Sequence, residues 1–274
     1  MLLDLAKVLL KKEYLKHYDK ADNFGKYFMD EKIAHSYQVL GAGNYLLKHE
    51  ESFKYSNKEE LDRLRATLLL HDVGRFYEAL VGRSGISVDH GIYGAEILAN
   101  IKEFQDLNIV LPVRHHGHLI HYLLEDESYQ TLDLSEKREI DRIISMVMDA
   151  DKIANFYLLA RENEKMEDLF FPKHEAGENN KKASSKVVEE YMKHSLVNRA
   201  NVTNWADRAL LFVACAYDLH YKSSFEFLER LNIMSRILKW IRKYWDEEEA
   251  EIYVNEMENF LKDKLQNIQP FEHF

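Results

Sequence analysis

The adjacent pair His71–Asp72 is the part of this chain whose residue types most directly suggest chemistry. It ends the apolar segment ATLLL and is followed by Val73, Gly74 and Arg75. Histidine offers a neutral imidazole nitrogen and aspartate offers two carboxylate oxygens, so the pair can bind one divalent ion and share it with a second. Gly74 lets the backbone turn sharply just after the pair. Because His-Asp is a common dipeptide, the prediction of a metal site depends on further ligands elsewhere.

Four further side chains of this kind, His35, His90, His116 and Asp151, lie where helical periodicity expects an apolar core residue. Any one of the histidines alone is explained more simply as a buried residue bonded to a backbone carbonyl. Asp151 is harder to explain, because burying an unpaired carboxylate requires a cation or strong hydrogen-bond donors. Asp149, two residues earlier, is predicted to point elsewhere and to be solvated.

Taken together, five predicted helices each place one metal-binding side chain where an apolar residue was expected. Helical bundles build metal sites from imidazoles and carboxylates on the inward faces of packed helices. Five or six ligands are more than one tetrahedral ion needs, and they suit two ions that share a carboxylate. Asp72 is the natural bridge because it directly follows His71.

The order His, His-Asp, His, His, Asp resembles that of the HD-domain superfamily of metal-dependent phosphohydrolases. The resemblance covers residues 30–157, a little under half of the chain, and the helical remainder carries no motif of its own. The matching stretches are AHSYQVLGAG with His35, HDVGRF from His71, DHGIYGAEIL from Asp89, RHHG from Arg114 and MDADKIANF from Met148.

The resemblance implies an all-α fold, with an HD-domain helical bundle and additional C-terminal helices. It implies hydrolysis of a small phosphorylated substrate, with a nucleotide as the expected class, at a site of one or two metal ions. Asp72 would be the catalytic residue that holds both ions, which could be Fe, Mn, Ni, Co, Zn or Mg. The implied ligand sets are His35, His71, Asp72 and Asp151 for one ion, and Asp72, His90 and His116 for a second.

Residues next to these ligands carry further expectations. His115 is a candidate for an additional ligand, because the subgroup of the family that cleaves cyclic dinucleotides has a His-His pair here. That subgroup continues with Gly-Tyr-Pro, whereas this chain continues GHLIHY, which argues against a cyclic dinucleotide substrate. Arg75 and Lys152 are expected to bind phosphate oxygens, although either could instead form a surface salt bridge. His118 and His121 fall off the apolar stripe and are predicted to be surface residues.

Two other functions fit the same residues. A branch of the superfamily similar to myo-inositol oxygenase uses the same six-ligand pattern to hold two irons and activate O₂, and ligand spacing does not separate it from the hydrolases. The other alternative is a non-enzymatic regulatory protein that binds metal or nucleotide. The complete ligand set favours an enzyme, because a pure scaffold needs no open, reactive metal positions.

The elements that must position these residues are predicted to be helices. Only 3 prolines and 10 glycines interrupt 274 residues, which is typical of long helices and an all-α fold. Pro112 is expected in the first turn of its helix. Residues 1–170 are predicted to form the HD-type metal-binding domain, and residues 171–274 a C-terminal helical extension packed on it. The helices expected in that extension lie near 186–198, 204–221, 224–245 and 247–266.

Charge and composition narrow the expected partners and compartment. The formal net charge of −10 argues against binding long nucleic acid, whose affinity depends on neutralising many phosphates. The single cysteine, Cys215, excludes an internal disulfide and suits a reducing cytosol. No signal peptide and no apolar run of the roughly 18 residues needed to span a bilayer is recognised. A cytoplasmic protein without a membrane partner is therefore expected, and its oligomeric state is left open.

Overall fold

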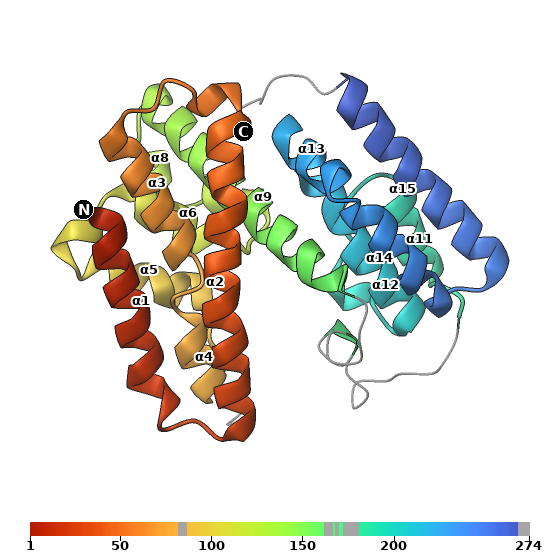
Figure 1. Ribbon diagram of the computed structural model, residues 1–274, viewed down its shortest axis with the longest axis horizontal. Helices are drawn as coiled ribbons and strands as arrows, with labels where there is room; N and C mark the ends of the chain where they lie inside the picture. The colour runs from red at the N-terminus through yellow and green to blue at the C-terminus, as the bar shows by residue number, and fades with distance from the viewer. Residues whose placement is uncertain (82–86, 162–166, 168–169, 172–180, 268–274) are drawn as a thin grey trace. The chain divides into compact units, whose positions relative to one another are not determined.

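The computed structural model is helical throughout the residues that it describes, which are 1–81, 87–161, 167, 170–171 and 181–267. No strand occurs in these ranges, and the predicted all-α fold is confirmed (Figure 1). The chain divides into two compact units inside the long helix α9 (Leu134–Leu159), with Met1–Asp151 in the first and Lys152 beginning the second. The sequence prediction placed a boundary at residues 170 and 171. The polar stretch that suggested it runs over residues 172–186, of which 172–180 lie outside the described residues.

The first unit contains the helices that carry every predicted metal ligand. Pro112 lies in the middle of the helix Leu107–His115 rather than in its first turn. The reason is that Asp106 caps this helix, five residues before the expected start. The helices are α1 (Leu2–Tyr18), α2 (Asn23–His49), η1 (Glu51–Phe53), α3 (Lys58–Leu70), α4 (Arg75–Val81), α5 (His90–Ala99), η3 (Lys102–Phe104), α6 (Leu107–His115), α7 (Ile120–Leu124), α8 (Glu127–Gln130) and the first part of α9.

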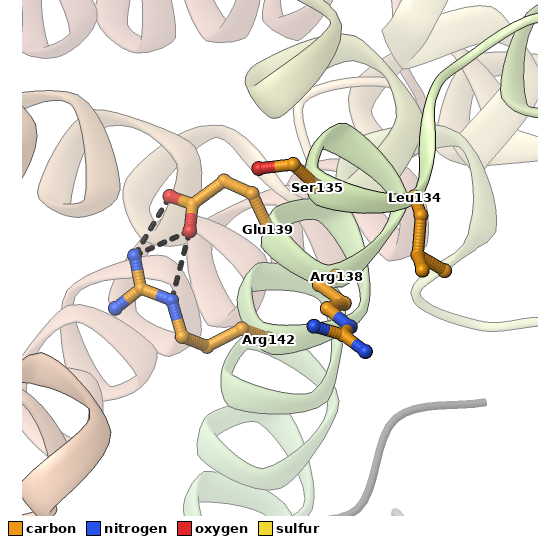
Figure 2. Close-up of a pocket in the computed structure, with 5 residues that line it drawn as sticks. All are labelled: Leu134, Ser135, Arg138, Glu139 and Arg142. Carbon is orange, nitrogen blue, oxygen red and sulfur yellow. Dashed lines mark hydrogen bonds and ion pairs between the residues drawn. The ribbon is translucent and has the colours of Figure 1, made fainter.

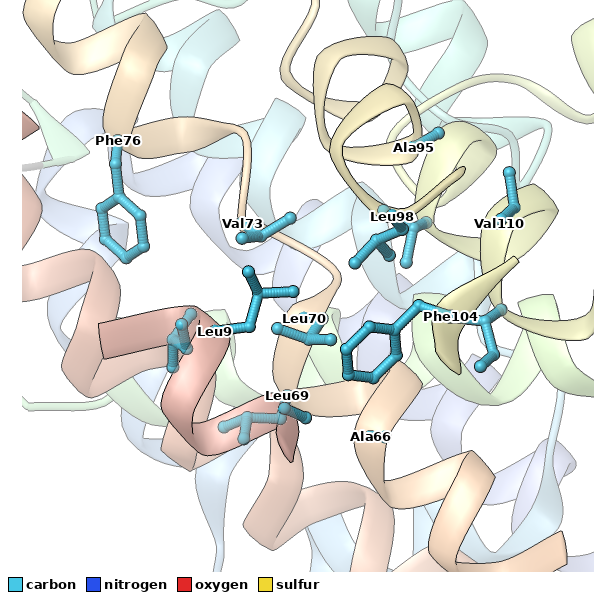
Figure 3. Packing of buried hydrophobic residues seen from close by; sticks show 14 of the residues in the cluster. Leu9, Ala66, Leu69, Leu70, Val73, Phe76, Ala95, Leu98, Phe104 and Val110 are labelled. Carbon is cyan, nitrogen blue, oxygen red and sulfur yellow. The ribbon is translucent and has the colours of Figure 1, made fainter. Parts of the chain in front are cut away.

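A buried apolar cluster joins α1, α3, α4, α5 and α6 (Figure 3). The last turn of α3 is apolar on both faces. Neighbouring helices cover both faces, so these side chains are all buried. The residues of this cluster that Figure 3 labels are Leu9, Ala66, Leu69, Leu70, Val73, Phe76, Ala95, Leu98, Phe104 and Val110. The core therefore fixes the residues on both sides of His71–Asp72, so that this turn is held rigidly.

An ion pair between Arg142 and Glu60 connects the N-terminal half of α9 to α3. Arg142 donates to Glu60 at 2.6 Å and to Glu139, one turn earlier on its own helix, at 2.7 Å. Figure 2 shows the Arg142–Glu139 pair at the edge of a surface hollow of about 400 Å³. Both partners of the Arg142–Glu60 pair are largely buried, so this contact helps to set the position of α9 against the rest of the first unit.

The second unit is a separate set of helices. The sequence predicted one helix over 224–245, but the structure breaks it between α13 and α14, where Asn232 has a φ of 50°. Asparagine tolerates this left-handed conformation better than most residues, and it interrupts the helix there. The described helices after α9 are α11 (Ser185–Met192), η5 (Arg199–Asn201), α12 (Trp205–Ala214), η6 (Cys215–Asp218), α13 (Lys222–Arg230), α14 (Ile233–Ile241), η7 (Arg242–Tyr244) and α15 (Glu247–Asn267).

A buried carboxylate, Asp207, organises the N-terminal ends of two helices in this unit. Its side chain accepts hydrogen bonds from the backbone and hydroxyl groups of Ser184 and Thr203, at 2.6 to 2.9 Å. These donors satisfy the buried charge, so Asp207 has a structural explanation. Among the described helices, none has both the length and the apolar character that crossing a membrane requires.

Candidate metal centre

The His71–Asp72 pair lies in a tight turn between α3 and α4. His71 is the capping residue directly after α3. The turn is held by hydrogen bonds from Val73 N to Leu70 O at 3.0 Å and from Arg75 N to Asp72 O at 2.9 Å. Because the apolar end of α3 is buried, both side chains of the pair start from inside the first unit. His71 is fully buried and the side chain of Asp72 is 3% exposed.

Two glycines let the neighbouring helices approach this turn closely. A Cβ atom at Gly74 would collide with the carbonyl oxygen of His90, at the start of α5. A Cβ atom at Gly91 would collide with the carbonyl oxygen of Arg114, at the end of α6. Glycine is therefore needed at both positions for close approach of the backbones. These contacts bring His90, the first residue of α5, and His116, which follows α6, to the His71–Asp72 turn.

One group of side chains gathers at one oxygen of Asp72. His71 Nε2 lies 3.6 Å from Asp72 Oδ2 and 3.7 Å from Asp151 Oδ1. His35 Nε2, from α2, lies 2.7 Å from the same oxygen of Asp151, on α9. His35, His71 and Asp72 each offer one ligand atom, and these atoms all lie within 4.8 Å of one another. Four predicted ligands from three separate parts of the chain therefore meet here.

A second group gathers at the other oxygen of Asp72. His116 Nε2 lies 3.3 Å and His90 Nε2 lies 3.4 Å from Asp72 Oδ1. The two Nε2 atoms are themselves 3.3 Å apart. Again the three ligand atoms all lie within 4.8 Å of one another. The carboxylate of Asp72 thus lies between two ligand groups and directs one oxygen at each.

The histidine nitrogens of the two groups are arranged for binding a metal ion rather than for hydrogen-bonding one another. His71 Nδ1 bonds the carbonyl of Leu68 at 2.8 Å, and His116 Nδ1 bonds the carbonyl of Val113 at 2.8 Å. A carbonyl can only accept, so each Nδ1 carries a proton, and in the neutral imidazole each Nε2 then presents a lone pair. His71 Nε2 is buried without a hydrogen-bond partner. Metal-binding histidines are commonly oriented by such contacts of their second nitrogen.

The electrostatics of the two groups favour ionised carboxylates and mostly neutral imidazoles. Burial lowers the pKa of His90 to about 3 and also lowers the pKa of His35. Burial opposes protonation of His71 as well, but the two nearby carboxylates outweigh it and raise the pKa of His71. Burial alone would raise the pKa of Asp72, but neighbouring cations, first among them Lys32, hold that pKa well below its usual range. An ionised Asp72 beside unprotonated nitrogens is suited to a divalent cation.

Three charged residues border the centre on its more exposed side. Lys32 Nζ lies 3.0 Å from Asp72 Oδ2, and Arg75 Nε lies 3.3 Å from Asp72 Oδ1. Glu78 Oε2 accepts from the Arg75 guanidinium at 2.7 Å and lies 4.0 Å from His90 Nδ1. The side chains of Lys32, Arg75 and Glu78 are 20 to 28% exposed, so solvent reaches the centre here. The sequence interpretation missed Lys32 and Glu78, although Lys32 precedes His35 by one helical turn.

The structure does not bring His115 into either ligand group. Its Nε2 lies 3.0 Å from Asp126 and its Nδ1 lies 3.2 Å from His118, and the latter is paired with Asp89 at 2.7 Å. The side chain of His118 is 19% exposed, so it lies at the surface as predicted but is partly covered by these contacts. His121 is exposed as predicted.

Two further side chains on α9 differ in their surroundings from the sequence expectations. Asp149 is fully buried, which contradicts the predicted solvation. Lys152 forms an ion pair of 2.7 Å with Asp218, within the second unit. Its contact with phosphate stays a prediction, as does metal binding by the ligand groups.

Comparison with known proteins adds one finding. A family model for the HD domain matches residues 33–155, the range that contains all six predicted ligands. No curated protein and no solved structure matches the chain. The match and the ordered His and Asp groups agree in extent, and residues 33–155 accordingly form an HD domain.

Proposed function

We propose that this protein is a metal-dependent phosphohydrolase that acts on a small phosphorylated substrate, most simply a nucleotide. The observation that carries the proposal is the position of Asp72, whose two oxygens are directed at two different groups of histidine nitrogens. Such a carboxylate can bridge two divalent ions. Ions held in this way lower the pKa of a bound water and clamp phosphate oxygens during in-line attack.

The residues of the chain have separate roles in this proposal. His35, His71 and Asp151 would hold one ion with Asp72, while His90 and His116 would hold the other. Asp72 would contribute one oxygen to each ion, and the ions would supply an activated water for attack on the phosphate. The buried Nδ1 contacts of His71 and His116 keep their Nε2 atoms directed at the centre, so little reorganisation is needed when metal binds.

The charges around the centre support a phosphorylated substrate. The chain is acidic overall, with a formal net charge of −10, but Lys32 and Arg75 place two positive charges at the accessible side of Asp72. Bound divalent ions would add further local positive charge. A compact phosphate group is therefore attracted to this point of the surface, whereas a long nucleic acid meets an acidic protein.

Phosphate release tests the proposal. The purified chain would be loaded in turn with Mn²⁺, Ni²⁺, Co²⁺, Fe²⁺ or Mg²⁺ and assayed against a panel of nucleotides and other phosphoesters. At least one metal and substrate should give turnover. Asp72→Asn should lower that turnover by more than roughly 100-fold. Loss of a residue that only hydrogen-bonds a metal ligand typically costs roughly 10- to 100-fold, and Asp72 is proposed to bind the ions directly. The exposed Asp19→Asn is the matched control and should retain full activity.

The same preparation separates the hydrolase from the other members of its family. Absence of phosphate release with every metal would contradict the proposal. Oxygen uptake with the EPR signal of a mixed-valent di-iron site, and no phosphate release, would instead assign an oxygenase. Tight nucleotide binding without turnover in the presence of metal would assign a regulatory binding protein.

A further inference from the structure

We propose that Lys32 is a built-in competitor for the metal centre that becomes a substrate-binding group once metal is bound. Its ammonium lies 3.0 Å from Asp72 Oδ2, an oxygen that one ion would use. When metal displaces it, the ammonium is free to bind an anionic group of the substrate. This inference rests on the proposed function, because it assigns Lys32 to recognition of the phosphate at that same centre.

The position of Lys32 is set by α2. It lies one helical turn before His35, so both side chains leave the same face of α2, where His35 joins His71 and Asp72 in one ligand group. Its Nζ is 3.0 Å from Asp72 Oδ2, the oxygen that faces His71. Asp72 is also the one carboxylate that pairs with Lys32 among the residues that the structure describes.

A divalent cation at Asp72 Oδ2 would lie close to the Lys32 ammonium. Both would lie within a few ångströms of the same oxygen, in a site where Asp72 and His71 are almost completely buried. Like charges at this separation repel strongly where water is largely excluded. The charge of Lys32 therefore opposes metal binding at His35 and His71, and the ammonium turns away from Asp72 Oδ2 when an ion binds there.

Arg75 is not displaced in the same way. Its Nε contacts the other oxygen of Asp72, but its terminal nitrogen is held by Glu78 at 2.7 Å. Lys32 has a flexible stem, and its ammonium already lies 5.8 Å from the centre of the Phe28 ring. A cation is stabilised weakly at an aromatic face and can rest there. The freed ammonium, 20% exposed beside the centre, is then placed to bind a phosphate oxygen.

Two titrations of the full chain test these two roles. The first adds Mn²⁺ to metal-free protein, and the second adds inorganic phosphate to the Mn²⁺-loaded protein. Lys32→Met removes the charge but keeps an unbranched side chain, and it should bind Mn²⁺ roughly tenfold more tightly and phosphate roughly tenfold more weakly than wild type. Lys32→Arg keeps the charge and should retain phosphate binding. Lys48→Met, an exposed change on the same helix, should alter neither affinity.

The outcomes separate this inference from the hydrolase proposal. Equal Mn²⁺ affinity in wild type and Lys32→Met would overturn the competition, and equal phosphate affinity would overturn the binding role, even in an active hydrolase. If Lys32→Met binds Mn²⁺ more tightly and phosphate more weakly, but the wild-type chain hydrolyses no substrate, the roles of Lys32 would be supported and the hydrolase proposal overturned. If the Lys32→Arg protein still binds phosphate and the Lys32→Met protein does not, the positive charge is responsible for phosphate binding.

Discussion

At the residue scale, the histidines of the centre differ in what orients their second nitrogen. His71 and His116 bond backbone carbonyls through Nδ1, whereas His90 Nδ1 lies 4.0 Å from the carboxylate of Glu78. A carboxylate behind a metal-binding imidazole fixes the ring and makes it a stronger ligand. The distance of 4.0 Å is too long for a hydrogen bond, so we propose that Glu78 positions His90 through its charge, while it also holds the guanidinium of Arg75.

Replacing Glu78 with Gln should weaken metal binding at the His90 and His116 group by roughly tenfold. This is the lower end of the effect of residues that contact metal ligands, because the Glu78–His90 contact is long and partly exposed. Mn²⁺ titration followed by calorimetry measures this change. Glu96→Gln, an exposed change on the same helix as His90, is the control and should bind Mn²⁺ as wild type does. Unchanged affinity in Glu78→Gln would rule out its positioning role.

The residues of the centre were largely predictable one by one, but their partners were not. Apolar periodicity identifies which side of a helix faces the core, and it placed His35, His71 and Asp151 there. Periodicity does not say what a polar side chain contacts across the core. Lys32 and Glu78 were missed for this reason, since each looks like an ordinary surface charge until the helices are packed together.

At the element scale, close backbone contacts at two glycines assemble the centre. Gly74→Ala and Gly91→Ala should each separate helices that now touch, because the added methyl group meets a backbone carbonyl that cannot move aside cheaply. Each should lower the free energy of unfolding by roughly 1–3 kcal/mol, as overpacking does, and should weaken Mn²⁺ binding. Urea unfolding and Mn²⁺ titration measure the two effects.

Gly41→Ala is the matched control for these two changes. No atom lies within 4 Å of the position that its Cβ would occupy, and Gly41 lies inside α2. Alanine should therefore leave Mn²⁺ binding unchanged and stabilise the helix by up to about 1 kcal/mol. Equal effects of Ala at positions 41, 74 and 91 would contradict the role of close packing in forming the centre.

The Glu60–Arg142 pair between α3 and α9 gives the stability a defined pH dependence. Burial alone would raise the pKa of Glu60, but Ser56 and Arg142 outweigh it and lower that pKa. The contribution of Glu60 is then complete above the ordinary glutamate pKa of about 4.3 and is lost as the pH falls toward the lower folded value. The Glu60→Gln protein should be about 1–2 kcal/mol less stable at pH 7.

Urea unfolding between pH 7 and pH 3.5 checks this dependence. The difference in stability between wild type and Glu60→Gln should shrink as the pH falls below about 4.3. Glu59→Gln, the exposed neighbour on α3, should match wild type throughout. A difference for Glu60→Gln that stays constant over the whole range would contradict an ionised, paired Glu60.

Helix type was predictable from the sequence, but helix ends were not. The expected helix over 224–245 is broken at Asn232, where a single left-handed residue interrupts an otherwise helical pattern. Pro112 was expected to start a helix, but Asp106 supplies the cap five residues earlier by accepting from Asn108 N. In both cases a local hydrogen bond or dihedral angle decides the boundary, and apolar spacing does not report either.

At the scale of the whole molecule, the centre and the family match lie in the same half of the chain. The six predicted ligands fall within residues 33–155, and the first compact unit ends at Asp151, the last of them. The domain boundary predicted at residues 170 and 171 stays a prediction, because a long continuous helix gives no sign of where its surroundings change. The second unit is held by its own buried contacts, such as those of Asp207, and its role in the proposed reaction stays open to experiment.

Anomalous scattering from crystals grown with Mn²⁺ is the most direct test of the central claim that Asp72 bridges two ligand groups. We expect two peaks, about 3.5–4 Å apart, on opposite sides of the Asp72 carboxylate. One should lie at His35, His71 and Asp151, and the other at His90 and His116. Full Mn²⁺ saturation with no peak at Asp72, and with these histidines still bonded only to protein atoms, would contradict it.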